Sequence, residues 1–209
     1  MAEVYLRRLS RWQAEQQRDA VADVHVRAYR GAVGEEHRDR QGFLDRLEQH
    51  VQHTGFDMVV ADTAGTVGCA YGYRVPRSGE WWSDFQGELP ADIEELTASG
   101  RAFLLAELMV LPAHRRRGIA TRMVERLLIR LDADLLVAAP DRPVDGHSGG
   151  GGGGGGIGDP RSAAAEAFRA WGWSRFGVLG AHAAPGFAFG VPPGRDTVAR
   201  EVWIRRPLR

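Results

Sequence analysis

The chain has 209 residues, of which 44% are hydrophobic and 26% are charged, and its 27 basic and 27 acidic residues give a formal net charge of zero. This balance is typical of a globular protein with one sizeable core. Because nucleic-acid binding draws much of its affinity from a basic surface, the charge balance argues against a nucleic-acid partner. The single cysteine, Cys69, excludes an internal disulfide and a cysteine metal cluster, and its alternating apolar context predicts a buried strand position.

Targeting and membrane segments are not expected from the sequence. No apolar stretch reaches the roughly 18 residues of a membrane span, and the first residues lack the apolar region of a signal peptide. The histidines show no metal-ligand spacing, so no metal is expected. A cytoplasmic protein without a membrane partner is the resulting expectation.

Hydrophobic periodicity predicts strands and helices in alternation along the chain, which is typical of an α/β protein. The segment 134–139 is short, apolar and closely follows a helix, so it is predicted to be a buried parallel strand. The predicted strands cover 4–9, 57–61, 66–75, 102–110, 134–139, 173–178 and 201–205, and the predicted helices cover 14–30, 37–52, 118–131 and 162–171.

Two segments interrupt this alternation. Residues 76–100 are predicted to be an insertion with a short helix at 91–98, and its Trp81 and Trp82 either cover an apolar acceptor or anchor the insertion or a dimer. Residues 149–156 are eight consecutive glycines, which have no side chain to fix a shape and therefore predict a flexible loop over about 146–158. With these two segments included, residues 1–209 are predicted to form a single domain.

The most informative segment is FLLAELMVLPAHRRRGIATRMVERLL, residues 103–128. A strand is predicted to end at about Val110, Pro112 stops ladder pairing, and a basic run leads into an amphipathic helix. The first turn of a helix has unpaired N–H groups and carries the positive end of the helix dipole. Gly118 and Ala120 allow a ligand to approach this backbone, which predicts an anion site suited to a pyrophosphate. The basic residues that can reach further phosphates are Arg115, Arg116 and Arg117.

This segment resembles the acetyl-CoA-binding motif of the GNAT superfamily of N-acetyltransferases. The family pattern Arg/Gln-x-x-Gly-x-Gly/Ala is matched by Arg115, Gly118 and Ala120, and residues 108–112, LMVLP, match the family's strand end, Leu-x-Val-x-Pro. The order of predicted elements over residues 3–206 also fits. The resemblance implies the GNAT fold, with a mixed central β-sheet flanked by helices. It also implies transfer of an acetyl group from acetyl-CoA to a primary amine of a small molecule, peptide or protein.

The resemblance further implies roles for the matched positions. The strand end would pair with the pantetheine arm through its backbone, the loop amides would hold the pyrophosphate, and a hydroxyl would add a contact. The cofactor-binding residues expected in this way are Leu108, Met109, Val110, Arg115, Arg116, Arg117, Gly118, Ile119, Ala120 and Thr121. Neither a metal nor a second cofactor is expected.

Candidate catalytic and acceptor-binding residues lie outside this motif. An ammonium group must lose a proton before it attacks a thioester, so the carboxylate of Glu107 is a candidate general base. Orientation of the acceptor and pairing with Arg101 are the alternatives for Glu107. Tyr29 at the end of the first helix and Trp82 in the insertion are candidate acceptor contacts, with core packing as the alternative for Tyr29.

The helix predicted at 162–171 departs from the family pattern. A frequent Asn falls at about Arg161, and the Tyr often proposed to protonate the leaving thiolate falls at Phe168, which cannot donate a proton. The alternative function is therefore a non-catalytic acyl-CoA-binding sensor or partner-binding module of the same fold. The sequence leaves open the acceptor, the acyl-chain length and whether the protein is a homodimer.

Overall fold

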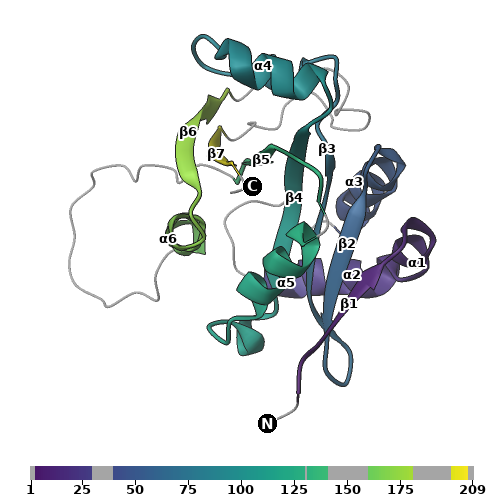
Figure 1. Ribbon diagram of the computed structural model, residues 1–209. Helices are drawn as coiled ribbons and strands as arrows, with labels where there is room; N and C mark the ends of the chain where they lie inside the picture. Colours follow the sequence, from purple (N-terminus) through teal and green to yellow (C-terminus); the bar gives the residue numbers. More distant parts are fainter. Residues whose placement is uncertain (1–2, 30–39, 130, 141–159, 181–198, 207–209) are drawn as a thin grey trace, which may run out of the picture.

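The computed structural model describes residues 3–29, 40–129, 131–140, 160–180 and 199–206 (Figure 1). The strands are β1 Tyr5–Leu9, β2 Asp57–Asp62, β3 Thr66–Arg74, β4 Ala102–Val110, β5 Leu135–Ala138, β6 Ser174–Leu179 and β7 Arg200–Arg205. The helices are α1 Arg11–Gln16, α2 Arg18–Ala28, α3 Arg40–Gln52, α4 Ala91–Ala98, α5 Ile119–Leu128 and α6 Pro160–Ala170, with short 3₁₀ turns η1 Glu80–Trp82 and η2 Pro112–His114.

The strands of the described residues form one seven-stranded mixed sheet in the order β1-β2-β3-β4-β5-β7-β6. β4 and β5 run parallel, and every other pair of neighbours among these strands is antiparallel. All four residues of β5 are buried. The predicted α/β class, the mixed sheet and the buried parallel strand after a helix are therefore confirmed.

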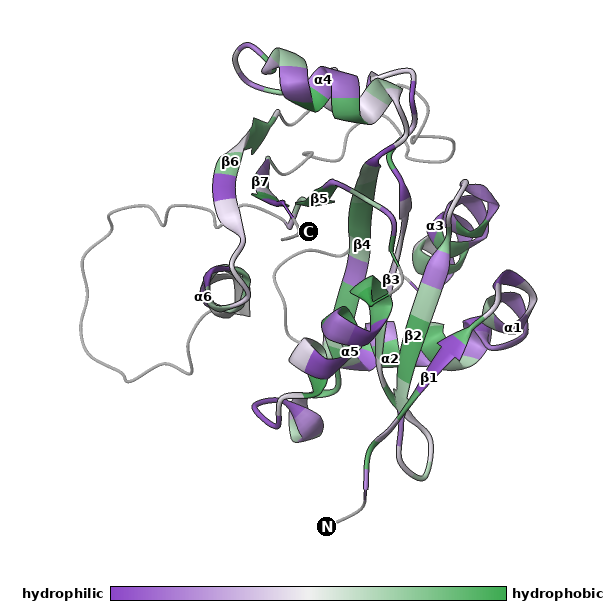
Figure 2. Cartoon of the chain, in the orientation of Figure 1, coloured by the Kyte–Doolittle hydropathy of each residue, from purple (hydrophilic) through white to green (hydrophobic). Residues whose placement is uncertain are grey.

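Helices cover both faces of the sheet (Figure 1). His50 of α3 contacts Tyr71 of β3, whereas a side chain at Gly68 of β3 would meet Met123 of α5. Residues three apart on a strand point to opposite faces, so α3 and α5 lie on opposite sides of the sheet. Hydropathy agrees with this layering, because β4 is mostly hydrophobic while α4 and α5 alternate between hydrophobic and hydrophilic residues (Figure 2).

The prediction of one helix over 14–30 is wrong, because the chain forms α1 and α2 there. Ser10 begins α1 with a capping box, in which its side chain accepts from Gln13 and Gln13 bonds back to the Ser10 backbone. The helix then breaks at Gln17, whose φ of −102° and ψ of 9° are not helical. Ala14 and Val21 are both fully buried on either side of the break, so the apolar spacing continues across it and hides it.

The insertion at 76–100 is packed onto the sheet. Trp81 and Trp82 are 4% and 5% exposed, and they share a core cluster with Leu104 of β4 and Leu135 of β5. The indole N–H of Trp82 donates to the hydroxyl of Thr97 in α4 at 3.0 Å, which ties the two halves of the insertion together. The predicted glycine-rich loop at about 146–158 lies outside the described residues.

Candidate functional site

β4 is paired with β5 only along its first half. Pairing between the two strands ends at Leu105 and Ala138, whereas β4 continues to Val110. On its other edge β4 stays paired with β3, although the register shifts so that Ala106 is an extra residue. Such a bulge bends a strand and redirects the side chains next to it. The second half of β4 therefore has one edge without a neighbouring strand among the described residues.

One hydrogen bond shows which backbone N–H groups of β4 point toward this open edge. The N–H of Leu111 donates to the Val67 carbonyl of β3 at 2.8 Å. Because the N–H groups of successive strand residues alternate between the two edges, those of Leu108 and Val110 face the open edge and that of Met109 faces β3. Leu108 and Val110 can thus pair with an extended ligand as predicted, but the backbone of Met109 is directed away from it.

The loop after β4 has the geometry of an anion site. Gly118 has a φ of 70° and directly precedes α5, and Arg116 has a φ of 62°, which is the only positive value at a non-glycine residue among the described positions. Alternating left-handed residues turn backbone N–H groups into a concave surface, and the helix N-terminus adds a positive dipole end. A Cβ atom built on Gly118 would have no atom within 4 Å, so there is room for a ligand.

The three arginines of the loop differ in what they contact. Arg115 donates from Nε to the carbonyl of Val110 at 3.0 Å and from Nη2 to the carbonyl of Ala28 at 2.6 Å. Arg116 and Arg117 are exposed and form no hydrogen bond or ion pair with the residues described here. These two have their whole guanidinium groups available to an anion, whereas the two carbonyl bonds of Arg115 occupy two of its five N–H donors and fix the direction of its side chain.

The remaining predicted cofactor residues lie in the first turn of α5. The side chain of Ile119 is 2% exposed, so only its backbone faces a ligand. The hydroxyl of Thr121 accepts a hydrogen bond of 3.0 Å from the indole N–H of Trp171, at the end of α6. Because an indole can only donate, this bond leaves the proton of the Thr121 hydroxyl to be donated elsewhere. No sequence pattern predicted this contact of Trp171.

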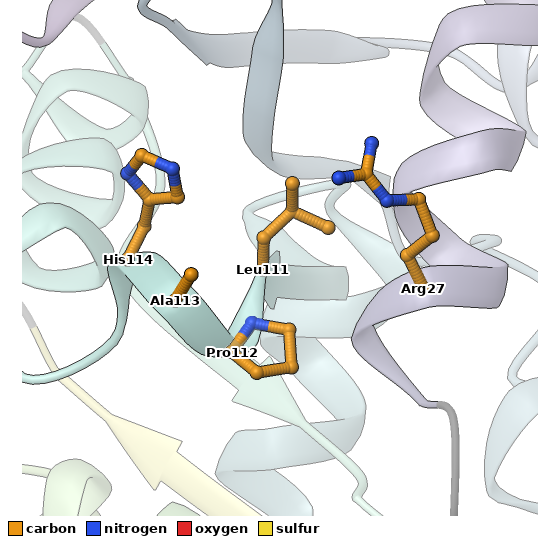
Figure 3. A pocket seen from close by; sticks show the side chains of 5 residues that line it. All are labelled: Arg27, Leu111, Pro112, Ala113 and His114. Atoms are coloured by element: carbon orange, nitrogen blue, oxygen red, sulfur yellow. The ribbon is translucent and has the colours of Figure 1, made fainter.

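A pocket of about 310 Å³ lies beside the turn that leads into this loop (Figure 3). Arg27 reaches it from α2, and the other lining residues come from the end of β4 and from η2. No sequence pattern predicted a role for Arg27, because it comes from a helix that is distant in sequence. The residues that line the pocket are Arg27, Leu111, Pro112, Ala113 and His114.

Glu107 lies on β4 just after the extra residue Ala106 and faces α2. Its Oε1 accepts a hydrogen bond of 2.8 Å from the Tyr29 hydroxyl, and its Oε2 is 3.8 Å from Nδ1 of the buried His25. The structure thus brings together Glu107 and Tyr29, which the sequence predicted separately. Arg101, the alternative partner of Glu107, forms an ion pair with Asp134 instead.

Two neighbours of Glu107 on β3 stay protonated near neutral pH. Burial raises the pKa of the Cys69 thiol well above its ordinary value, and the charge of Glu107 raises it further. The same two causes raise the pKa of Tyr71, which pairs with Glu107 across the strands. Neither residue supplies an anionic nucleophile or base, which leaves the carboxyl group of Glu107 as the candidate base of this cluster. The predicted burial of Cys69 is confirmed.

Phe168 and Trp82 lie in packing environments. Phe168 is 6% exposed and stacks on Trp203 of β7, with ring centroids 5.7 Å apart. Trp82 belongs to the core cluster of the insertion, which favours an anchoring role, and its contact with an acceptor stays a prediction. The side chain of Arg161 lies outside the described residues.

The described residues were also compared with the requirements of a metal site and of a membrane-spanning helix. Among them, no group of three or more His, Cys, Asp or Glu side chains is placed to hold a metal ion. No helix in the same ranges combines the length and the apolar character needed to cross a bilayer.

Comparison with known proteins places this geometry in a family. The sequence matches the model of the acetyltransferase (GNAT) family over residues 18–138, which is more than half of the chain. No curated protein matches it. Solved structures share its fold at low sequence identity. One is a protein from Desulfovibrio desulfuricans described as an acetyltransferase of the GNAT family, with 15% identity, a TM-score of 0.58, and coverage of 98% of this chain and 99% of that chain.

Two similar structures contain a bound ligand. The Salmonella typhimurium protein yncA, described with its cofactor acetyl-CoA, has 14% identity and a TM-score of 0.55, with 98% of this chain and 94% of that chain covered. The PaiA N-acetyltransferase of Thermoplasma acidophilum, in complex with coenzyme A, has 8% identity and a TM-score of 0.54, with 98% and 99% covered. Identities this low show the fold alone. The family match and the shared fold together show that the chain belongs to the GNAT family of acetyltransferases.

Proposed function

We propose that this protein is an N-acetyltransferase that transfers an acetyl group from acetyl-CoA to a primary amine of a small molecule, peptide or protein. The observation that carries the proposal is the open edge of β4, which has an anion-binding loop at one end and the Glu107 carboxylate beside it. The structures of yncA and PaiA, which contain acetyl-CoA and coenzyme A, support an acyl-CoA as the second substrate.

The residues of the open edge and the loop fit acetyl-CoA, whose thioester supplies an activated acyl group. The backbone N–H groups of Leu108 and Val110 bind the pantetheine arm, and one of them donates to the thioester carbonyl oxygen as negative charge develops there. The loop amides and the exposed side chains of Arg116 and Arg117 bind the phosphates. Holding the amine next to the thioester in a ternary complex supplies much of the acceleration.

Glu107 removes the proton that the amine must lose. Tyr29 donates to one carboxylate oxygen and thereby fixes the orientation of the group. The side chain is 15% exposed, so a substrate amine or one bridging water can reach it. Tyr29 then has a positioning role and also forms part of the acceptor side of the site.

Glu107→Gln tests this assignment, because it keeps the shape of the side chain and removes its negative charge. The acetylation rate is expected to fall by about 10²–10⁴, the usual range for general acid–base catalysis, and the acidic limb of the pH–rate profile should move or disappear. Acetyl-CoA affinity, measured by calorimetry, should stay close to that of the wild type. Glu125→Gln, at an exposed position of α5, is the matched control. An unchanged rate and pH profile on a good acceptor would show that Glu107 is not the general base and would favour its alternative role in orienting the acceptor.

The packing of Phe168 motivates a second candidate function. With a phenylalanine buried against Trp203 at the position of the usual tyrosine, this position has no acid to protonate a leaving thiolate. A non-catalytic acyl-CoA-binding sensor would need no acid. Tight acetyl-CoA binding with no transfer to any member of a broad panel of amines would favour the sensor, whereas turnover of one amine would favour the enzyme.

The proposal also includes the cellular setting expected from the sequence. A formal net charge of zero supports small-molecule or peptide acceptors over nucleic acid, and the location proposed is the cytoplasm without a membrane partner. Measurement of the molecular mass in solution would decide between a monomer and a homodimer.

A further inference from the structure

Arg115 connects two elements that are distant in the sequence. Its Nη2 donates to the carbonyl of Ala28, the last residue of α2, and its Nε donates to the carbonyl of Val110, the last residue of β4. Ala28 and Arg115 are 87 residues apart in the chain. The guanidinium therefore joins the beginning of the cofactor loop to the end of α2, next to Tyr29 and Glu107.

Within the residues that the structure describes, Arg115 is the hydrogen-bond donor found for each of these two carbonyls. Ala28 is in the last turn of α2, where carbonyls have no intrahelical donor. The carbonyl of Val110 faces the open edge of β4, like its N–H, beyond the end of the pairing with β5. Ala28 is 5% exposed and Val110 is 7% exposed, and a buried carbonyl without a hydrogen bond is costly. A cation at a helix C-terminus also interacts favourably with the helix dipole.

The residue after Ala28 is Tyr29, whose hydroxyl donates to Glu107. The end of α2 is thus held against β4 at two places, by Arg115 through the backbone and by Tyr29 through its side chain. If the Arg115 contact were lost, the end of α2 would be free to shift, and Tyr29 would shift with it. A small misplacement of a catalytic group by a remote change can cost about a hundredfold in rate.

We infer that Arg115 is a positioning residue, which couples the conformation of the cofactor loop to the placement of Tyr29 and Glu107 on the acceptor side. This inference rests on the proposed acetyl transfer for its kinetic consequence, but its structural part can be measured without turnover. This role is distinct from the phosphate-binding role expected for the three arginines of the loop.

Replacement of Arg115 by Lys separates the two roles. Lysine keeps the positive charge that a phosphate contact needs, but its single ammonium group lacks the planar fork that reaches two carbonyls of different elements. Arg115→Met removes the charge as well as the fork. Arg122→Lys is the matched control, because Arg122 on α5 also donates to a backbone carbonyl, that of Val4 at 3.2 Å, just before β1.

The first measurement is amide hydrogen exchange by NMR on the full chain. The Tyr29 amide donates to the His25 carbonyl at 3.1 Å, so its exchange reports the order of the last turn of α2. In both Arg115 variants the Tyr29 amide is expected to exchange at least about tenfold faster than in the wild type, whereas it should be unchanged in Arg122→Lys. Exchange at the wild-type rate in both Arg115 variants would overturn the inference, whether or not the protein transfers acetyl groups.

The second measurement separates acceptor kinetics from acetyl-CoA affinity. In Arg115→Lys, kcat/KM for the amine should fall at least about tenfold, while the Kd of acetyl-CoA stays within about threefold of the wild type. Arg115→Met should lose acceptor kcat/KM to a similar extent. If Arg115→Lys keeps normal acceptor kinetics and only Arg115→Met weakens acetyl-CoA binding, Arg115 is a phosphate ligand and the inference is wrong. If the wild type transfers no acetyl group, the proposed function fails and the exchange measurement alone decides the role of Arg115.

Discussion

Gly118 combines three properties at one position. Its φ of 70° is left-handed, it directly precedes α5, and the space where a Cβ atom would lie is open. An open position means that glycine is not required there by packing. The backbone conformation and the approach of a ligand to the helix N-terminus are the remaining reasons for glycine at this place.

Gly118→Asp should weaken acetyl-CoA binding at least about tenfold, which is on the order of 1.4 kcal/mol, because it puts a negative charge where the pyrophosphate approaches. Gly118→Asn is the matched control, since Asn has the same shape without the charge and also tolerates a left-handed conformation. Calorimetry on both variants measures the effect. Equal affinity of the Asp variant and the wild type, with the fold intact, would exclude this loop as the cofactor site.

Side-chain contacts between distant residues are the part of the site that the sequence did not predict. Tyr29 and Glu107 were each predicted as candidates, but their hydrogen bond joins residues 78 apart in the chain. The bonds of Arg115 are equally remote, and the motif alone favoured a phosphate contact for it. The orientation of Met109 was also missed, because it depends on the bulge at Ala106, and the glycine at that register shift, Gly72, lies on β3 and not on β4.

The sequence predicted the helices and strands better than it predicted the side-chain contacts. The strand, turn and helix of residues 102–128 were predicted because their signals are local: an apolar run, a proline, a glycine and a helical stripe. The break between α1 and α2 was missed because Gln17 has no distinctive side chain and the buried positions keep their spacing across it. That residues 76–100 are an insertion stays a prediction, and their packing over β4 and β5 depends on contacts that periodicity does not reveal.

The run of eight glycines at 149–156, outside the described residues, gives a prediction for a connecting element. Shortening it to about three residues should change the free energy of unfolding by well under 1 kcal/mol, because loop-closure entropy varies only logarithmically with length. Chemical denaturation and acetyl-CoA calorimetry on the shortened protein check this. Loss of acetyl-CoA binding with unchanged stability would instead make the run a ligand-binding loop.

The stability of the whole molecule should depend on pH through His50 of α3. The pKa of His50 is lowered from its ordinary 6.5 to about 3, mostly by burial and also by the nearby His53 and Arg46. Its ring also faces β3, with Nδ1 3.2 Å from the Tyr71 hydroxyl and a ring contact with Tyr73. Burial also lowers the pKa of His53. Both phenols are uncharged at acidic pH, and burial raises the pKa of each further above its ordinary value.

Protonation of His50 therefore opposes folding. Between pH 6.5 and about 3, His50 is protonated in the unfolded chain but neutral in the folded protein, so the unfolded state binds more protons. The free energy of unfolding should then fall as the pH drops through this range, and His50 contributes at most about 1.4 kcal/mol per pH unit to that slope. His50→Gln removes the titrating group and should flatten the dependence. Urea denaturation at a series of pH values measures it, with Gln52→Ala at an exposed position of the same helix as the control. A slope in His50→Gln equal to that of the wild type would show that His50 is not the group responsible.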